Sequence, residues 1–123
     1  MKKKLILASA VLLFASCEGF DNHGYPSKMS FDARGGIKMV SGELAFMYLG
    51  ITDYNGNGTS GGHNDETQDT FIVTYQWLTV KATPFKDEMT IVAEPNTTGK
   101  TRRLYIDGGT DTRNVEIKVT QAP

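Results

Sequence analysis

The sequence predicts an all-β fold, a sandwich of two antiparallel sheets, and two observations support this prediction. In the last third of the chain, residues 88–121, apolar and polar residues alternate with a period of two, which is typical of strands with one buried face. Along the whole chain, about seven short segments of strand character are separated by turn-forming residues, without a convincing helical period. Strands without helices bury their apolar faces by packing sheet on sheet.

The last third contains three alternating runs separated by two turns. Residues 95–99 (PNTTG) and 107–111 (DGGTD) accept turn dihedrals or hydrogen-bond their own backbone. This part of the chain therefore reads as strand, turn, strand, turn, strand. The apolar residues expected to face the core are Met89, Ile91, Ala93, Leu104, Ile106, Val115, Ile117 and Val119.

Two further strands are expected near the start of the domain, and one follows them. Residues 28–33 and 37–41 flank Arg34-Gly35-Gly36, a turn that either closes a hairpin or moves the chain between sheets. Residues 44–51 are apolar on both faces, which indicates a central strand. A helical turn over residues 43–49 would fit equally well, because short apolar runs are ambiguous.

Aromatic residues gather on residues 44–51 and on residues 71–80, which are expected to form one further strand. The rings that would share a face are Phe46 and Tyr48 on the first strand and Phe71, Tyr75 and Trp77 on the second. If the two strands paired, these rings would form a cross-strand ladder. An exposed ladder would suit sugar binding, because sugar C–H faces stack on aromatic rings. The alternative, which we favour for Phe71 and Trp77, is that the rings fill the core.

Several short motifs follow one another in a distinctive order. They are FDARGG at 31–36 before the apolar run 37–40, QWLTV at 76–80, EPN at 94–96, two arginines at 102–103, and KVTQ at 118–121. Over about residues 26–123 their order and spacing resemble the BACON family (Bacteroidetes-associated carbohydrate-binding often N-terminal domain). The resemblance implies an immunoglobulin-like antiparallel β-sandwich of about seven strands and a carbohydrate- or mucin-binding role. Residues 44–70 depart from the family's shorter route to its Trp strand.

Length and charge limit the number of domains and the classes of partner. With 123 residues, of which 39% are hydrophobic, the chain is long enough for one domain with one core and has no room for a separate catalytic domain. From Cys17 onward, 10 basic residues face 14 acidic ones, a net charge of −4. Without a basic run, we expect no nucleic-acid partner.

The first 16 residues are expected to be a lipoprotein signal peptide. Lys2–Lys4 precede an apolar run, residues 5–14, that is too short to span a bilayer. The sequence FASC at 14–17 resembles a bacterial lipobox, although Phe14 replaces the usual Leu. This resemblance implies cleavage before Cys17, thioether lipidation and acylation with chains such as palmitate, which together form a stable anchor. The alternative is that Cys17 stays an ordinary thiol.

Residues 17–27 are expected to form the lipidated cysteine and a polar tether, followed by the domain at 28–123. Glu18 and Asp21 resemble the acidic signal that sends lipoproteins to the outer membrane with the domain facing the cell exterior. The alternative is that they are solvated linker charges. The expected location is therefore the outer membrane, by a lipid anchor.

The polar segment 52–70 contains the start of a calcium-loop pattern. Asp53, Asn55 and Asn57 occupy the first ligand positions of D-x-[DN]-x-[DN]-G, but the twelfth position is Asn64 instead of Glu. A weak calcium site is one reading, and a flexible Asn-Gly-rich insertion is the other. No other cofactor is expected.

Two classes of function remain after this reading. No nucleophile, base and orienting group come together in the sequence, so we expect no enzyme. One class is a cell-surface module that binds glycan or mucin through Tyr54, Asn55, Asn57 and Tyr75. The other is a spacer or protein-interaction subunit of an outer-membrane glycan-utilisation or adhesion assembly, which would meet its partner through the apolar residues 44–51.

Overall fold

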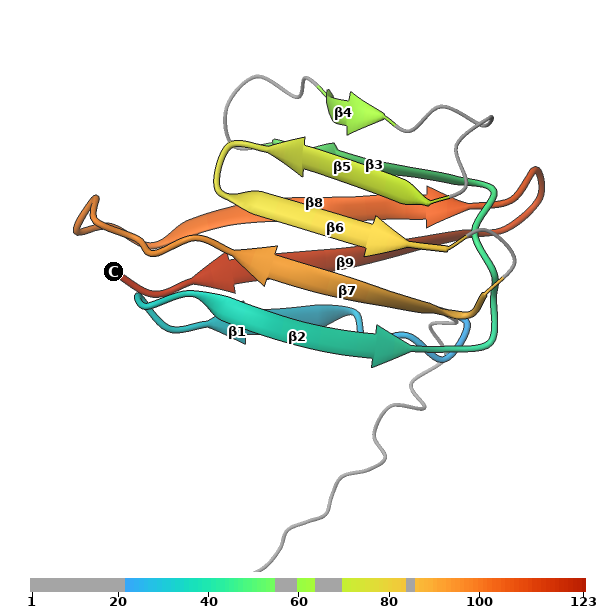
Figure 1. Cartoon of the computed structure of the whole chain (residues 1–123), viewed down its shortest axis with the longest axis horizontal. Helices are drawn as coiled ribbons and strands as arrows, with labels where there is room; N and C mark the ends of the chain where they lie inside the picture. The colour runs from blue at the N-terminus through green and yellow to red at the C-terminus, as the bar shows by residue number, and fades with distance from the viewer. Residues whose placement is uncertain (1–21, 55–59, 64–69, 84–85) are drawn as a thin grey trace, which may run out of the picture.

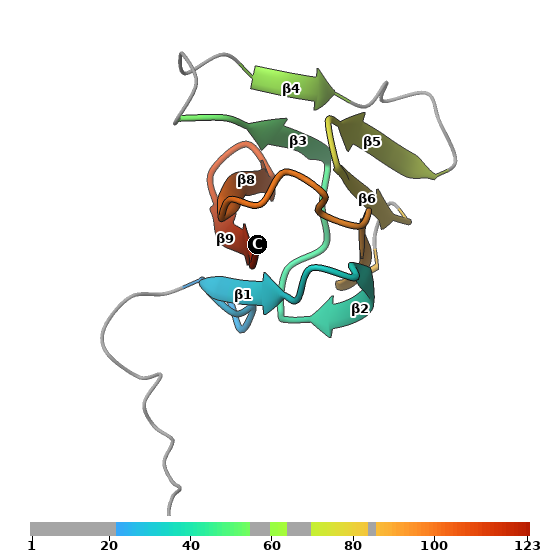
Figure 2. The same cartoon turned by 90° about the vertical axis from the view of Figure 1, so that its left-hand side faces the viewer.

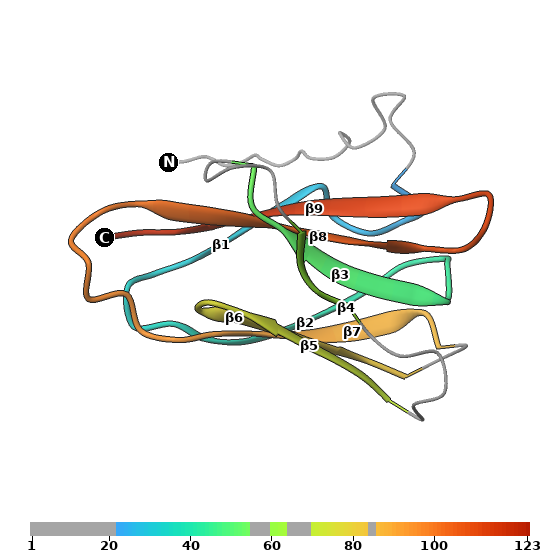
Figure 3. The same ribbon diagram turned by 90° about the horizontal axis from the view of Figure 1, so that it is seen from above.

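The computed structural model describes residues 22–54, 60–63, 70–83 and 86–123, and these form two β-sheets packed face to face (Figure 1, Figure 3). The strands are β1 (Lys28–Phe31), β2 (Gly36–Ser41), β3 (Tyr48–Thr52), β4 (Ser60–His63), β5 (Phe71–Tyr75), β6 (Leu78–Ala82), β7 (Glu88–Ala93), β8 (Arg102–Gly109) and β9 (Asn114–Gln121). Within this described part there is no helix, and hence none that is long and apolar enough to cross a membrane. The predicted β-sandwich is confirmed.

The two sheets differ in size and share one core. The five-stranded sheet has the order β1-β9-β8-β3-β4, and the four-stranded sheet has the order β2-β7-β6-β5. Figure 2 looks along the sandwich and shows the two layers side by side. All eight apolar residues predicted to face the core in β7, β8 and β9 are buried. Strands β8 and β9 form a hairpin, whereas the chain crosses from one sheet to the other between β7 and β8.

The turn between β1 and β2 moves the chain from one sheet to the other, which was one of the two predicted alternatives. Strand β1 pairs with β9, in parallel orientation, and β2 pairs with β7. Gly35 has a φ of 77°, and a Cβ atom there would lie 2.2 Å from the carbonyl oxygen of Ala93. A glycine is therefore required at the point where the chain leaves the first sheet.

The middle of the chain differs from the prediction in two ways. Strand β3 starts at Tyr48, and Phe46 lies before it with its ring fully buried. The expected single strand over residues 71–80 is instead a hairpin of β5 and β6 over residues 71–82, because Gln76 takes a left-handed φ of 55° and turns the chain. This division, together with the short strand β4, gives nine strands in the described residues instead of about seven.

The aromatic ladder that pairing of the two strands would have given does not form, because β3 and β5 belong to different sheets. Phe71 and Trp77 are 2% and 5% exposed and lie in the core cluster, as the favoured alternative predicted. The apolar segment 44–51 is likewise mostly buried, with Met47 and Tyr48 as its exposed residues, and its role in binding a partner stays a prediction.

The packed domain starts earlier than the predicted boundary at residue 28. Tyr25 is 4% exposed, and its hydroxyl donates to the carbonyl oxygen of Leu44 at 2.8 Å. The Asn22 side chain donates to the backbone carbonyl of Glu116 at 3.0 Å and accepts from its amide at 3.1 Å. Residues 22–27, which the sequence assigned to a tether, are therefore part of the domain.

Candidate functional site

An exposed tyrosine lies on the outer face of the five-stranded sheet. Tyr54 follows β3, and its ring meets Tyr105 of β8 edge-on, with centroids 4.8 Å apart and an interplanar angle of 65°. Its hydroxyl donates to a carboxylate oxygen of Glu116 on β9 at 3.2 Å. The side chain is still 56% exposed. We call Tyr54, Tyr105 and Glu116 the tyrosine patch.

Strand alternation explains why these three residues meet. Leu104 and Ile106 point into the core, so Tyr105 between them points outward, and Glu116 points outward beside the buried Ile117. The charge of Glu116 raises the pKa of Tyr54, and the hydrogen bond adds to this effect. Tyr54 therefore stays protonated at neutral pH and can donate to the carboxylate.

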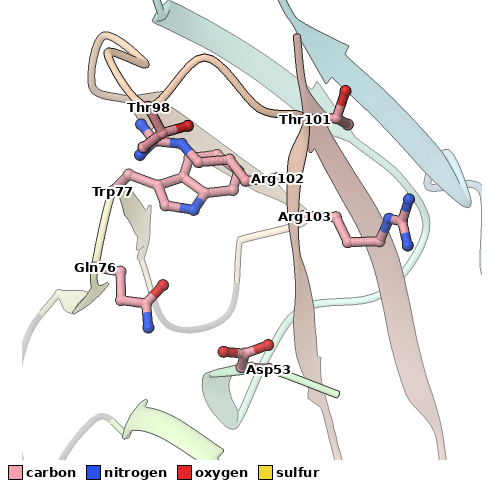
Figure 4. Close-up of a pocket in the computed structure, with 7 residues that line it drawn as sticks. All are labelled: Asp53, Gln76, Trp77, Thr98, Thr101, Arg102 and Arg103. Carbon is pink, nitrogen blue, oxygen red and sulfur yellow. The ribbon is translucent and has the colours of Figure 1, made fainter. Parts of the chain in front are cut away.

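A cleft of about 520 Å³ opens at one end of the sandwich (Figure 4). Asp53 in its lining directly precedes Tyr54 of the tyrosine patch. It lies where β3 ends, where β5 turns into β6, and where β8 begins. Its lining residues, which define the end cleft, are Asp53, Gln76, Trp77, Thr98, Thr101, Arg102 and Arg103. The volume is within the range of small-ligand sites, and the lining offers amide, hydroxyl, carboxylate and guanidinium groups for hydrogen bonds.

Trp77 and Arg102 form one wall of the end cleft. The guanidinium carbon of Arg102 lies 4.8 Å from the centroid of the indole ring, which is within cation–π distance. Arg102 also donates from Nε to the side-chain oxygen of Gln121 at 2.8 Å and from a terminal nitrogen to the carbonyl oxygen of Pro95 at 3.2 Å. Burial lowers the pKa of Arg102. Because Arg102 covers the indole, this ring is not a free stacking surface for a ligand.

Two buried amides hold the wall in place. Gln121 is fully buried, and its Nε2 donates to the carbonyl oxygens of Glu94 at 2.8 Å and Asp32 at 3.1 Å. Asn96 donates to the carbonyl oxygen of Ala122 at 2.9 Å and accepts from the Thr98 hydroxyl at 2.7 Å. These bonds tie the crossover between β7 and β8 to the C-terminal strand, so the end cleft is built on fixed elements.

The structure separates the residues that the sequence proposed as ligand contacts. Tyr54 lies on the outer face of the five-stranded sheet, whereas Tyr75 packs against the core from the four-stranded sheet. Asn55 and Asn57 lie outside the described residues. The glycan contacts proposed from the sequence therefore do not form one surface among the residues that are described.

The calcium hypothesis stays a prediction. Asp53 lines the end cleft, but its predicted co-ligands Asn55 and Asn57 are not described. In the described ranges, no three His, Cys, Asp or Glu residues gather into a group that could hold a metal ion.

Sequence reasoning missed Tyr105, Glu116 and Gln76 as site residues. The alternation of β8 and β9 marks Tyr105 and Glu116 as outward-facing, which is the signal that could have found them. Gln76 had no such signal, because nothing in the sequence around it indicates a turn.

A second exposed surface lies on the outer face of the four-stranded sheet. Ile37, Met39 and Ile72 are 70%, 67% and 54% exposed. Strand register places Ile37 beside Val92, and Met39 beside Thr90. Strand β2 also forms the edge of this sheet. We call this surface the apolar face.

No protein-family model matches the sequence, and no curated protein matches it. Among solved structures, an NMR structure of a Bacteroides thetaiotaomicron protein is similar with a TM-score of 0.56 at 14% identity, over 80% of this chain and 82% of that one. A Bacteroides ovatus GH5 xyloglucanase in complex with a XXXG heptasaccharide is similar with a TM-score of 0.50 at 18% identity, over 78% of this chain. The matched region is 17% of the xyloglucanase chain. At these identities the likeness concerns the fold.

Proposed function

We propose that the protein is a non-catalytic, lipid-anchored module of the outer-membrane surface that binds glycan or mucin through the tyrosine patch. The observation behind this proposal is the exposed ring of Tyr54, which Tyr105 and Glu116 hold on a flat sheet face. A sugar ring can stack its C–H face on the phenol ring. The Glu116 carboxylate beside it can accept hydrogen bonds from sugar hydroxyls.

The neighbouring end cleft can extend this contact. Asp53 lines the cleft and directly precedes Tyr54 in the chain, so a glycan on the ring has hydrogen-bonding groups within reach. Gln76, Thr98 and Thr101 supply neutral amide and hydroxyl groups of the kind that orient sugar hydroxyls. A chain of a few sugars would lie with one unit on Tyr54 and the next in the cleft.

Context also favours a glycan. The order of motifs resembles the BACON family, and the lipobox-like residues 14–17 imply an anchor at Cys17. One structural neighbour is a Bacteroides xyloglucanase in complex with a heptasaccharide, although the likeness shows the fold alone. These points support membership in a glycan-binding, surface-exposed group of lipoproteins.

The test is binding of the purified protein to an array of glycans and mucins, with two tyrosine variants. Tyr54→Ala should weaken binding about tenfold, the equivalent of about 1.4 kcal/mol, because the stacking ring is lost. Tyr48→Ala is the matched control, since Tyr48 is an exposed tyrosine at the other end of β3. Equal binding by wild type and Tyr54→Ala on every positive spot would refute the assignment, as would an array without a positive spot.

The apolar face favours a second candidate, a protein-interaction subunit. Exposed Ile37 and Met39 on the edge strand β2 are typical of a surface that another protein covers. Ile72 lies on the opposite edge strand, beyond Thr90 and Lys81. A photo-crosslinking residue in place of Met39 should then capture one defined partner in outer-membrane preparations. The same residue in place of Lys100, which is exposed on the crossover, serves as the control.

A further inference from the structure

Two lysines lie side by side on the outer face of the five-stranded sheet. In the parallel pair of β1 and β9, Lys28 is directly beside Lys118. Their chain neighbours Met29 and Val119 form the next pair and pack into the core, so both lysines point outward. Adjacent strands are about 4.8 Å apart. Like charges on directly neighbouring positions of a sheet repel each other, so the pair does not help the fold.

Arg103 joins this pair from β8. Arg103 is paired with Thr120 of β9, and Thr120 is paired with Ser30 of β1. These three residues therefore form a row across the sheet, two residues along the strands from Lys28 and Lys118 and on the same face. Figure 4 shows the side chains of Arg102 and Arg103 leaving the strand in opposite directions, with Arg103 pointing away from Trp77. The Nε atom of Arg103 is buried and has no hydrogen-bond partner among the described residues. Because this atom has almost no accessible surface, a ligand would have to meet the two terminal nitrogens of the same guanidinium.

In the described part of the chain, no carboxylate forms an ion pair with Lys28, Lys118 or Arg103, so no ion pair neutralises these cations there. Glu116, the nearest acid along the same face of β9, accepts the hydroxyl of Tyr54. An oxyanion here could accept hydrogen bonds from the two lysine ammonium groups and the Arg103 guanidinium. The hydroxyls of Thr120 and Ser30 lie in the same row as Arg103 and are further donors.

We propose that Lys28, Lys118 and Arg103 bind the sulfate or carboxylate group of an acidic polysaccharide. The inference rests on the proposed glycan-binding function. Tyr105 is directly beside Lys118 across the strand pair, and Tyr54 packs on Tyr105. A sugar stacked on Tyr54 therefore has its substituents close to the cations. The acidic group fixes the sugar's position, and the ring supplies the stacking contact.

A polysaccharide fits better than other polyanions. The adjoining exposed ring and the polar end cleft suit sugar units, which have both C–H faces and hydroxyls.

The test compares dextran sulfate and polygalacturonate with neutral dextran as ligands of the purified protein. The double variant Lys28→Gln/Lys118→Gln and the single variant Arg103→Gln should each bind the acidic polymers at least about tenfold more weakly. The matched control is Lys81→Gln/Lys86→Gln, which removes the same charge elsewhere and should bind within about twofold of wild type. Raising the salt concentration should weaken wild-type binding, because salt screens charge pairs.

Melting temperatures separate binding from folding. Because the two lysines repel each other, Lys28→Gln/Lys118→Gln should melt at or above the temperature of the wild type. A loss of binding in a variant that melts normally therefore reports on the site.

The other outcomes separate a failure of the oxyanion site from a failure of the tyrosine patch. Equal losses in the test and control double variants would indicate diffuse attraction instead of a site. Lysine-dependent binding to phosphatidylglycerol vesicles without binding to the acidic polymers would indicate a lipid surface. If binding of neutral glycans requires Tyr54 while the lysine variants bind every ligand like the wild type, the oxyanion site is refuted and the proposed function stands. If binding of acidic polymers requires the lysines but not Tyr54, the tyrosine patch is refuted and the oxyanion site stands.

Discussion

Replacement of the buried Gln121 by Leu should destabilise the domain strongly. Leucine keeps the volume but removes three hydrogen bonds, to Arg102, Glu94 and Asp32. A hydrogen bond with a charged group contributes about 1.5–3 kcal/mol, and each neutral one about 1 kcal/mol. The loss is therefore about 3–5 kcal/mol. At about 4 °C or more per kcal/mol for a domain of this size, the melting temperature should fall by at least about 12 °C.

The assay is thermal unfolding followed by circular dichroism, with urea titration as a second measurement. Thr120→Val is the matched control, because Thr120 precedes Gln121 on the same strand and points outward. The control should stay within about 0.5 kcal/mol of the wild type, as surface substitutions usually do. If Gln121→Leu melted within about 3 °C of the wild type, the hydrogen bonds of this amide would not hold the β7–β8 crossover to the C-terminal strand. In that case the rigid wall of the end cleft would need another explanation.

Two further predictions concern the fold. Burial, then the charges of Asp87 and Glu88, raise the pKa of Tyr25 to about 12, whereas an unfolded tyrosine titrates near about 10. Between these two pH values Tyr25 ionises only in the unfolded state. Its contribution to the free energy of unfolding is therefore fully present below about pH 10 and falls by about 2–3 kcal/mol as the pH rises toward 12. Tyr25→Phe should lack this decline in urea titrations at increasing pH; an unchanged decline would mean that another group causes it. Gly35→Ala should lower the melting temperature far more than Gly99→Ala, because both have positive φ but only Gly35 meets backbone at 2.2 Å; equal shifts would show that crowding at Gly35 is relieved.

Local patterns predicted most of the fold and failed where pairing is not local. Period-two alternation identified β7, β8 and β9 and their buried faces, because one-sided burial leaves that signature in sequence. The hairpin of β5 and β6 was missed, since its turn uses Gln76 in a left-handed conformation that glutamine seldom adopts. The parallel pairing of β1 with β9 joins the two ends of the domain, and no local pattern encodes it.

The candidate site was only partly predictable, for the same reason. Tyr54 could be selected because it is an aromatic residue in a polar segment. Its partner Glu116 lies 62 residues away in sequence and comes close only through the order of β3, β8 and β9. The cluster of Lys28, Arg103 and Lys118 was hidden in the same way. The net charge is acidic, and these residues become neighbours only on the folded sheet.

The most direct test of the central claim is a map of backbone amide chemical shifts during titration with saccharides. A suitable panel contains xyloglucan oligosaccharide, mucin glycans and dextran sulfate oligomers. We predict that at least one saccharide of the panel shifts the amide signals of Tyr54, Tyr105 and Lys118 and leaves those of Ile37 and Ile72 unchanged. Shifts confined to the apolar face, or no shift with any saccharide, would contradict the claim that the outer face of the five-stranded sheet binds glycans.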